Sequence, residues 1–91
     1  MSAVSGTFTV RVMVTDVWDQ VVLAVTATTT VAELKREALT RALRRAGIAL
    51  ERYVVKFHGA EVLDESVAVA DLGAGPNSPF IVLPSHRQAV R

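Results

Sequence analysis

The chain of 91 residues contains no cysteine. This absence excludes a disulfide framework, thiolate zinc sites and cysteine-ligated iron–sulfur clusters, and it fits a reducing compartment, so we expect a cytoplasmic protein. Long apolar runs are missing too. The longest is Val21–Val25, far short of a membrane span, and residues 1–6 lack the basic start and apolar core of a signal peptide. The length suits one domain with one core.

An excess of charge of either sign is also lacking. Ten Lys and Arg against nine Asp and Glu leave a net charge of +1, too small for the basic footprint of a nucleic-acid binder. The two histidines, His58 and His86, have no second ligand at metal spacing. Neither a catalytic constellation nor a glycine-rich phosphate loop is recognisable. We therefore expect no enzymatic activity, no cofactor, no metal and no small-molecule ligand.

Apolar residues, in contrast, are plentiful. They make up 51% of the chain, and the mean hydropathy is +0.35, high for a small domain that must cover itself with polar atoms. The composition predicts that some apolar surface stays exposed. Such patches tend to mark contact sites.

The N-terminal third predicts a β-hairpin. Apolar and polar residues alternate from Thr7 to Thr15 and again from Val21 to Thr26, with a turn at Asp16–Gln20 between them. Trp18 at the hairpin tip has two possible roles. It either folds back as a lid on the core edge, the more common arrangement, or projects as a contact anchor.

A helix is predicted from Val31. Thr30 and Glu33 have the spacing of a capping box, and Gly47 is expected to end the helix as a left-handed cap. The predicted buried stripe is Val31, Leu34, Ala38, Leu39, Ala42, Leu43 and Ala46. The predicted water-facing residues are Glu33, Lys35, Arg36, Glu37, Arg41, Arg44 and Arg45. We interpret the arginines near the helix end, together with Arg52, as a solvated face that offsets the helix dipole rather than as an anion-binding site.

Shorter elements fill the second half of the chain. Alternation predicts a third strand over Tyr53–Phe57, and apolar β character predicts a last strand over Phe80–Leu83. Between them we expect a tight turn over His58–Glu61, a short strand at Val62–Leu63, one helical turn near Val67–Ala70, and a loop over Gly73–Pro79.

This order of elements predicts an α+β fold of the β-grasp type. A mixed sheet of four to five strands would pack on one helix, with the last strand parallel to the first. The alternative is a ferredoxin-like plait, which needs a second full helix where the chain has only Ser66–Asp71.

The spacing from Phe8 to Leu83 resembles the ubiquitin-like family. Thr30, Val31, Leu34 and Ala38 match the start of ubiquitin's helix, and Gly47 and Ile48 match its end. Phe57 and Gly59 fall on the family's phenylalanine and turn glycine, and one inserted residue restores the register at Leu63. Family core positions are then matched by Val69, Leu72, Ala74, Phe80 and Val82. The resemblance implies a ubiquitin-like domain over residues 7–84, a flexible N-terminus over 1–6, and a flexible basic tail over 85–91.

The chain is also similar to small ubiquitin-like proteins of bacterial type VII secretion systems. Conjugating and sulfur-carrying members of the family act through a terminal Gly-Gly, whereas Ser85–Arg91 contains no glycine. A conjugated modifier or sulfur carrier is therefore the least favoured function. Polymer building through many lysines is not supported either, because the sequence holds only Lys35 and Lys56.

The sheet face away from the helix is the candidate site. It is expected to carry Arg11, Met13, Val22, Ala24, Val54, Lys56, Ile81 and Leu83, apolar at the centre and basic at the rim. Lys56, flanked by Val54 and His58, replaces the isoleucine of ubiquitin's recognition patch. The expected protein-binding residues are Arg11, Met13, Val54, Lys56, His58, Ile81 and Leu83.

Two functions remain open for this face. We expect a non-enzymatic adaptor that binds a protein through it, or alternatively a structural subunit of a larger membrane-associated or secretion assembly. Strand propensity alone could also place apolar residues there, or the tail could fold over them.

Overall fold

The computed structural model describes residues 7–44 and 47–85. The N-terminal segment 1–6, residues 86–91 of the expected tail, and the helix positions Arg45 and Ala46 lie outside the described residues. In chain order the elements are β1 (Phe8–Val14), β2 (Asp19–Val25), α1 (Val31–Leu43), the 3-10 turn η2 (Leu50–Arg52), β3 (Tyr53–Phe57), β4 (Ala60–Glu61), the 3-10 turn η3 (Val69–Leu72) and β5 (Pro79–Pro84).

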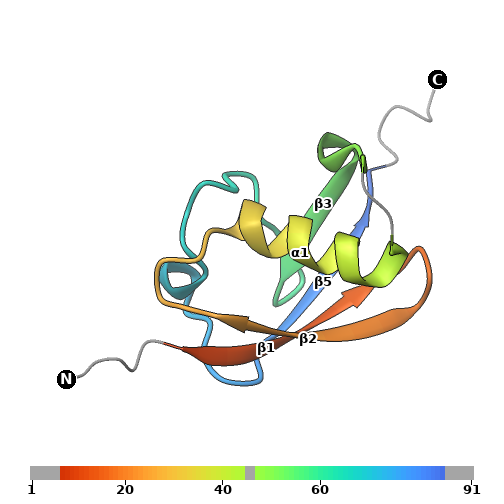
Figure 1. Ribbon diagram of the computed structural model, residues 1–91. Coiled ribbons are helices and arrows are strands. Elements are labelled where there is room, and N and C mark those ends of the chain that lie inside the picture. Colours follow the sequence, from red (N-terminus) through yellow and green to blue (C-terminus); the bar gives the residue numbers. More distant parts are fainter. Residues whose placement is uncertain (1–6, 45–46, 86–91) are drawn as a thin grey trace.

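The strands form one mixed sheet in the order β2-β1-β5-β3-β4, and α1 crosses one face of it (Figure 1). β1 and β5 are parallel, and every other neighbouring pair is antiparallel. This is the β-grasp fold, as predicted, with the last strand beside the first. The plait is wrong because the segment offered for its second helix holds only the 3-10 turn η3.

The core lies between α1 and the sheet. Phe57 and Phe80 stack there with ring centroids 4.7 Å apart. The buried apolar residues are Val10, Val12, Val14, Leu23, Val25, Val31, Leu34, Ala38, Leu39, Val55, Phe57, Val69, Phe80 and Val82. β1, β2, β3 and β5 contribute alternate residues to this set, as the period of two requires, whereas both residues of β4 are exposed.

The start of α1 follows the predicted capping box. The Glu33 amide donates to the Thr30 hydroxyl over 3.1 Å, and the Thr30 amide donates to Glu33 Oε1 over 2.9 Å. Two amides that the helix itself leaves unpaired are thereby satisfied. The helix start is thus fixed by local chemistry.

The end of α1 differs from the prediction. The helix stops at Leu43, and Arg44, not Gly47, takes the left-handed cap with φ 59° and donates its amide to Thr40. Stopping here allows Ile48 and Leu50 to pack against the core. Arg44 adopts a conformation that a glycine would adopt with less strain.

Lys35 is not on the water-facing side, contrary to the prediction. Its exposed fraction is 4%, because the side chain runs beneath the loop after β4. Its ammonium lies 2.6 Å from a carboxylate oxygen of Glu65 and donates to the backbone oxygen of Tyr53 over 3.0 Å. A buried charge needs such partners, and those partners are distant in sequence.

The turn after β3 is shorter than predicted. His58 and Gly59, with φ of 55° and 83°, form a two-residue hairpin loop of type I′ character, so β4 begins at Ala60 and the strand predicted at Val62–Leu63 is wrong. Val62 donates its amide to Val55 and packs on the core. Leu63, where the family register was expected to resume, is 84% exposed.

The helical turn predicted near Val67–Ala70 lies two residues later, as η3. Val67 instead accepts a hydrogen bond from the amide of Val31, and Thr29 accepts one from the amide of Val69. These bonds hold the segment against the start of α1 before the turn begins. Gly73, with φ 91°, ends it.

Candidate functional site on the open face of the sheet

We call the side of the sheet opposite α1 the open face. Strand alternation sends to it the residues between those of the core. Six of the seven residues predicted for the site lie on it, from three adjacent strands: Arg11 and Met13 of β1, Ile81 and Leu83 of β5, and Val54 and Lys56 of β3.

The strand register joins these residues into rows. Met13 is opposite Ile81, and Ile81 is opposite Lys56. Gln20 beside Met13 and Glu61 beside Lys56 extend this row over all five strands. The sequence analysis did not include these two residues, although the alternation of Gln20 with Val22 was a signal that could have found the first.

Two further rows flank this one. Val54 is opposite Leu83 on one side, and Arg11 lies between Val22 and Pro79 on the other. The result is a patch with apolar side chains at its centre. Ile81, at the middle of the patch, is 40% exposed.

The charged groups of the open face lie around this apolar centre. The Nε of Arg11 donates to the backbone oxygen of Asn77 over 3.3 Å, which ties the guanidinium to the loop before β5. Lys56 is half-buried and directly opposite the carboxylate-bearing Glu61. The arrangement suits a contact surface with a polar rim.

His58 is not brought to this patch. Its backbone forms the turn after β3, and its ring packs edge-on against that of Phe57 with centroids 4.2 Å apart. His58 itself is exposed, and it lies in the turn beyond the end of β3.

Trp18 projects from the tip of the β1–β2 hairpin. It is 76% exposed, so the lid arrangement is wrong, and its φ of 50° is one that bulky residues rarely adopt. The Tyr53 hydroxyl donates to Asp16 Oδ2 over 2.5 Å and fixes this turn to the start of β3. Trp18 is thus displayed on an ordered loop.

Within residues 7–44 and 47–85, no group of three His, Cys, Asp or Glu side chains could hold a metal ion. In the same part of the chain, no helix is long and apolar enough to cross a membrane.

Comparisons with known proteins agree with the architecture. No protein-family model and no curated protein sequence matches the chain. Among solved structures, the ubiquitin-like domain of an Arabidopsis thaliana protein superimposes with a TM-score of 0.70 at 20% identity, covering 91% of this chain and 82% of that one.

Ubiquitin of Caldiarchaeum subterraneum gives a TM-score of 0.73 at 11% identity, over 88% of this chain and 95% of its own. A designed protein based on ubiquitin gives 0.70 at 15% identity, over 86% and 88%. The chain therefore has the ubiquitin-like β-grasp fold. At these identities the likeness extends to the fold alone.

Proposed function

We propose that this chain is a non-enzymatic ubiquitin-like module, spanning residues 7–84, that binds another protein through the open face of its sheet. The observation that carries the proposal is the row of Met13, Ile81 and Lys56 on three adjacent strands. An antiparallel sheet face turned to water normally presents polar residues, whereas this one is apolar at its centre.

The chemistry of the patch indicates the kind of partner. Ile81 supplies an apolar anchor at the middle, and such an anchor contributes about 1.5–3 kcal/mol when a partner buries it fully. Arg11 and Lys56 supply positive charge beside it. A protein surface with an apolar pocket and carboxylates at its rim is complementary to this pattern.

The test uses variants of matched chemistry. Tagged wild-type domain, Ile81→Asp, and the control Leu63→Asp are compared in capture from native lysate, after circular dichroism has established that all three fold. A captured protein is then purified, and its affinity for each variant is measured by calorimetry.

We expect Ile81→Asp to weaken binding about 10- to 100-fold, as the loss of a buried anchor implies. Leu63→Asp places the same charge on an equally apolar, more exposed residue outside the strands, and it should bind like the wild type. Equal affinity of all three variants for the partner would refute the proposal.

The biological setting is part of the same proposal. A cytoplasmic adaptor is the version that the cysteine-free sequence favours, and the resemblance of the sequence to bacterial type VII ubiquitin-like proteins supports a setting of that kind. The alternative is a permanent subunit of a membrane-associated or secretion assembly. The exposure of Trp18 and Leu63 outside the open face favours it. A stoichiometric complex recovered with the membrane fraction would support the subunit, and reversible capture from the supernatant would support the adaptor.

A further inference from the structure

The outer edge of β2 is an unprotected strand edge. β2 has seven residues and, among residues 7–44 and 47–85, pairs only with β1, so one side of its backbone faces away from the sheet (Figure 1). Natural proteins blunt such edges with lysine, proline, a bulge or extreme shortness. The sequence of β2, DQVVLAV, contains none of these, whereas the opposite edge strand, β4, has two residues.

The backbone groups that point outward can be assigned from the ladder. The Arg11 amide donates to Ser78, just before β5, and the Thr15 amide donates to Val82 of β5, so the alternating residues Val10, Val12 and Val14 direct theirs to β2. The backbone amides and carbonyls of their register partners in β2, which are Leu23, Val21 and Asp19, point toward β1. The amides and carbonyls that face outward are therefore those of Gln20, Val22 and Ala24.

The run of outward-facing backbone groups on β2 ends before Thr26. The next outward amide, that of Thr26, donates to the hydroxyl of Thr29 over 2.9 Å. Three consecutive outward positions thus remain, centred on Val22. The side chain of Val22 is 54% exposed.

We propose that two copies of this chain pair through β2, antiparallel and about a two-fold axis at Val22. Val22 would then lie opposite itself, and Gln20 of one copy opposite Ala24 of the other. Each opposed pair exchanges two backbone hydrogen bonds, and all three outward positions are used. No like charges are opposed along the strand.

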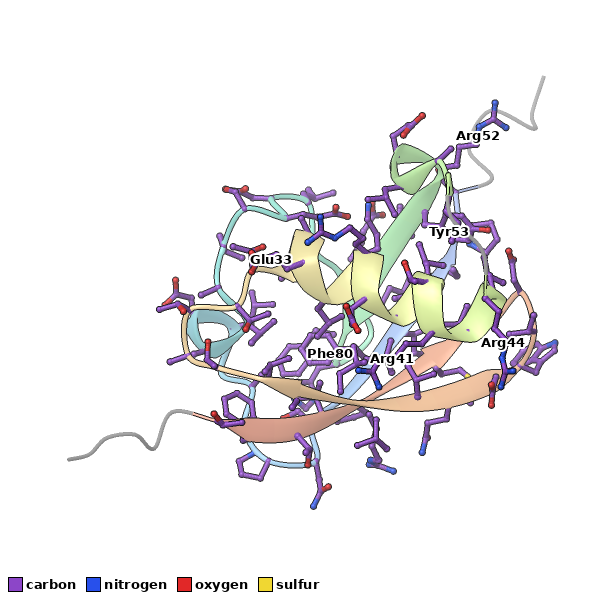
Figure 2. The ribbon with its side chains drawn as sticks, in the orientation of Figure 1. Glu33, Arg41, Arg44, Arg52, Tyr53 and Phe80 are labelled. Atoms are coloured by element: carbon purple, nitrogen blue, oxygen red, sulfur yellow. The ribbon has the colours of Figure 1, made fainter. Side chains whose placement is uncertain are left out.

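The flank of α1 beside this edge supports a second copy as the occupant. A groove of about 240 Å³ separates α1 from β2, and Leu23, Val25 and Leu34 contribute to its lining. The charged groups of its helix side are Glu33, Arg36, Glu37 and Arg41. Figure 2 shows Glu33 at the first turn of α1 and Arg41 near its end.

An antiparallel two-fold arrangement places the acidic start of one flank beside the basic end of the other. Glu33 of each copy then lies on the side of Arg41 of the other. Arg41 also pairs with its own Glu37 over 2.8 Å, so in the dimer its guanidinium would be shared between this Glu37 and Glu33 of the other copy. The surface is therefore complementary to itself, as a two-fold interface requires.

The absence of cysteine makes the register directly testable. In hydrogen-bonded antiparallel pairs, opposed Cα atoms are about 5.5 Å apart, a distance that a disulfide spans. Val22→Cys should therefore cross-link to itself under mild oxidation. Ala24→Cys should not, because the two copies of residue 24 would be about 13 Å apart, but it should cross-link to Gln20→Cys in a mixture. Leu63→Cys is the control for random collision.

A charge swap tests the same axis without oxidation. An edge pairing of this size is at the small end of protein interfaces, so we expect weak association. In sedimentation velocity, the apparent mass of the wild type should rise from that of a monomer toward that of a dimer between about 10 µM and 1 mM. Val22→Lys and Val22→Glu should each stay monomeric, since like charges would face each other, and their equimolar mixture should dimerise. Leu63→Lys should behave as wild type.

The proposal is overturned if wild type remains monomeric up to the highest concentration, if position 63 cross-links as well as position 22, or if association survives Val22→Lys. Protection of the Val22 and Ala24 amides only after addition of a different, extended protein segment would also assign the edge to another occupant. Thermal melting of each variant establishes that it is folded.

Discussion

Strand β5 contributes to two different surfaces within a few residues. Phe80 and Val82 are buried beneath α1, whereas Ile81 between them lies on the open face. All three side chains are strongly apolar, so hydropathy does not distinguish them. The difference is that α1 covers one side of the sheet, and this shows that an apolar residue is a core residue only where a second layer meets it.

The same contrast separates the two lysines. Lys35 lies under the loop between β4 and η3, where Glu65 and the Tyr53 carbonyl hold its charge. Lys56 lies on the open face opposite Glu61. One lysine is part of the interior, and the other belongs to the surface that we propose as a binding site.

Neighbouring substitutions on β5 test the contrast most strongly. We expect Phe80→Ala to lower the free energy of unfolding by about 3–5 kcal/mol, because it removes a stacked, fully buried ring. Ile81→Ala should cost about 1 kcal/mol or less, as is usual for partly exposed positions. Urea unfolding followed by circular dichroism gives both values. Losses of equal size would mean that the two faces are equally packed.

Matched substitutions of the two lysines should give a smaller effect. Lys35→Met keeps the stem but removes the ammonium from Glu65 and Tyr53, and we expect a loss of about 1–3 kcal/mol. Lys56→Met should change stability by about 0.5 kcal/mol at most. If Glu65→Gln destabilises the Lys35→Met variant as much as it destabilises the wild type, the two groups are not coupled and our interpretation is wrong.

The smallest effect is expected at Asp64, on the loop that covers Lys35. Hydrogen bonds from the Ser66 side chain, and then from its backbone amide, lower the pKa of Asp64 below its usual value of 3.8. A pKa lowered by folding contributes stability that is present above the unfolded value and is lost as the pH falls through the folded value.

Ser66→Ala should therefore destabilise the protein near pH 6, with the difference from wild type shrinking as the pH falls below 3.8. Thermal melting between pH 6 and pH 2 measures this. A difference that grows toward acid would contradict the assigned cause.

Predictions that depended on neighbours in sequence were the reliable ones. Thr30 and Glu33 are three residues apart, so the capping box could be read directly, and alternation located β3 at its observed bounds and β1 to within one residue at each end. The six residues of the open face followed from the same alternation. Their role in binding stays a prediction.

Predictions that depended on distant contacts failed. Lys35 was predicted to face water because no residue near it in the sequence indicates that Glu65, thirty residues later, pairs with its ammonium. The short strand was predicted at Val62–Leu63, not at Ala60–Glu61, because a two-residue turn at His58 and Gly59 could not be told from a longer one. Both errors come from loops whose path is set by what they pack against.

The sequence by itself determined the helix start, the four longer strands and the identity of the two faces, because these depend on hydrogen bonds and periodicities within a few residues. Only the tertiary structure decided where α1 ends, which lysine is buried and which edge of the sheet is left without a neighbour. These outcomes depend on the packing of segments far apart in the chain. A local pattern carries no information about a partner that folding alone brings into contact.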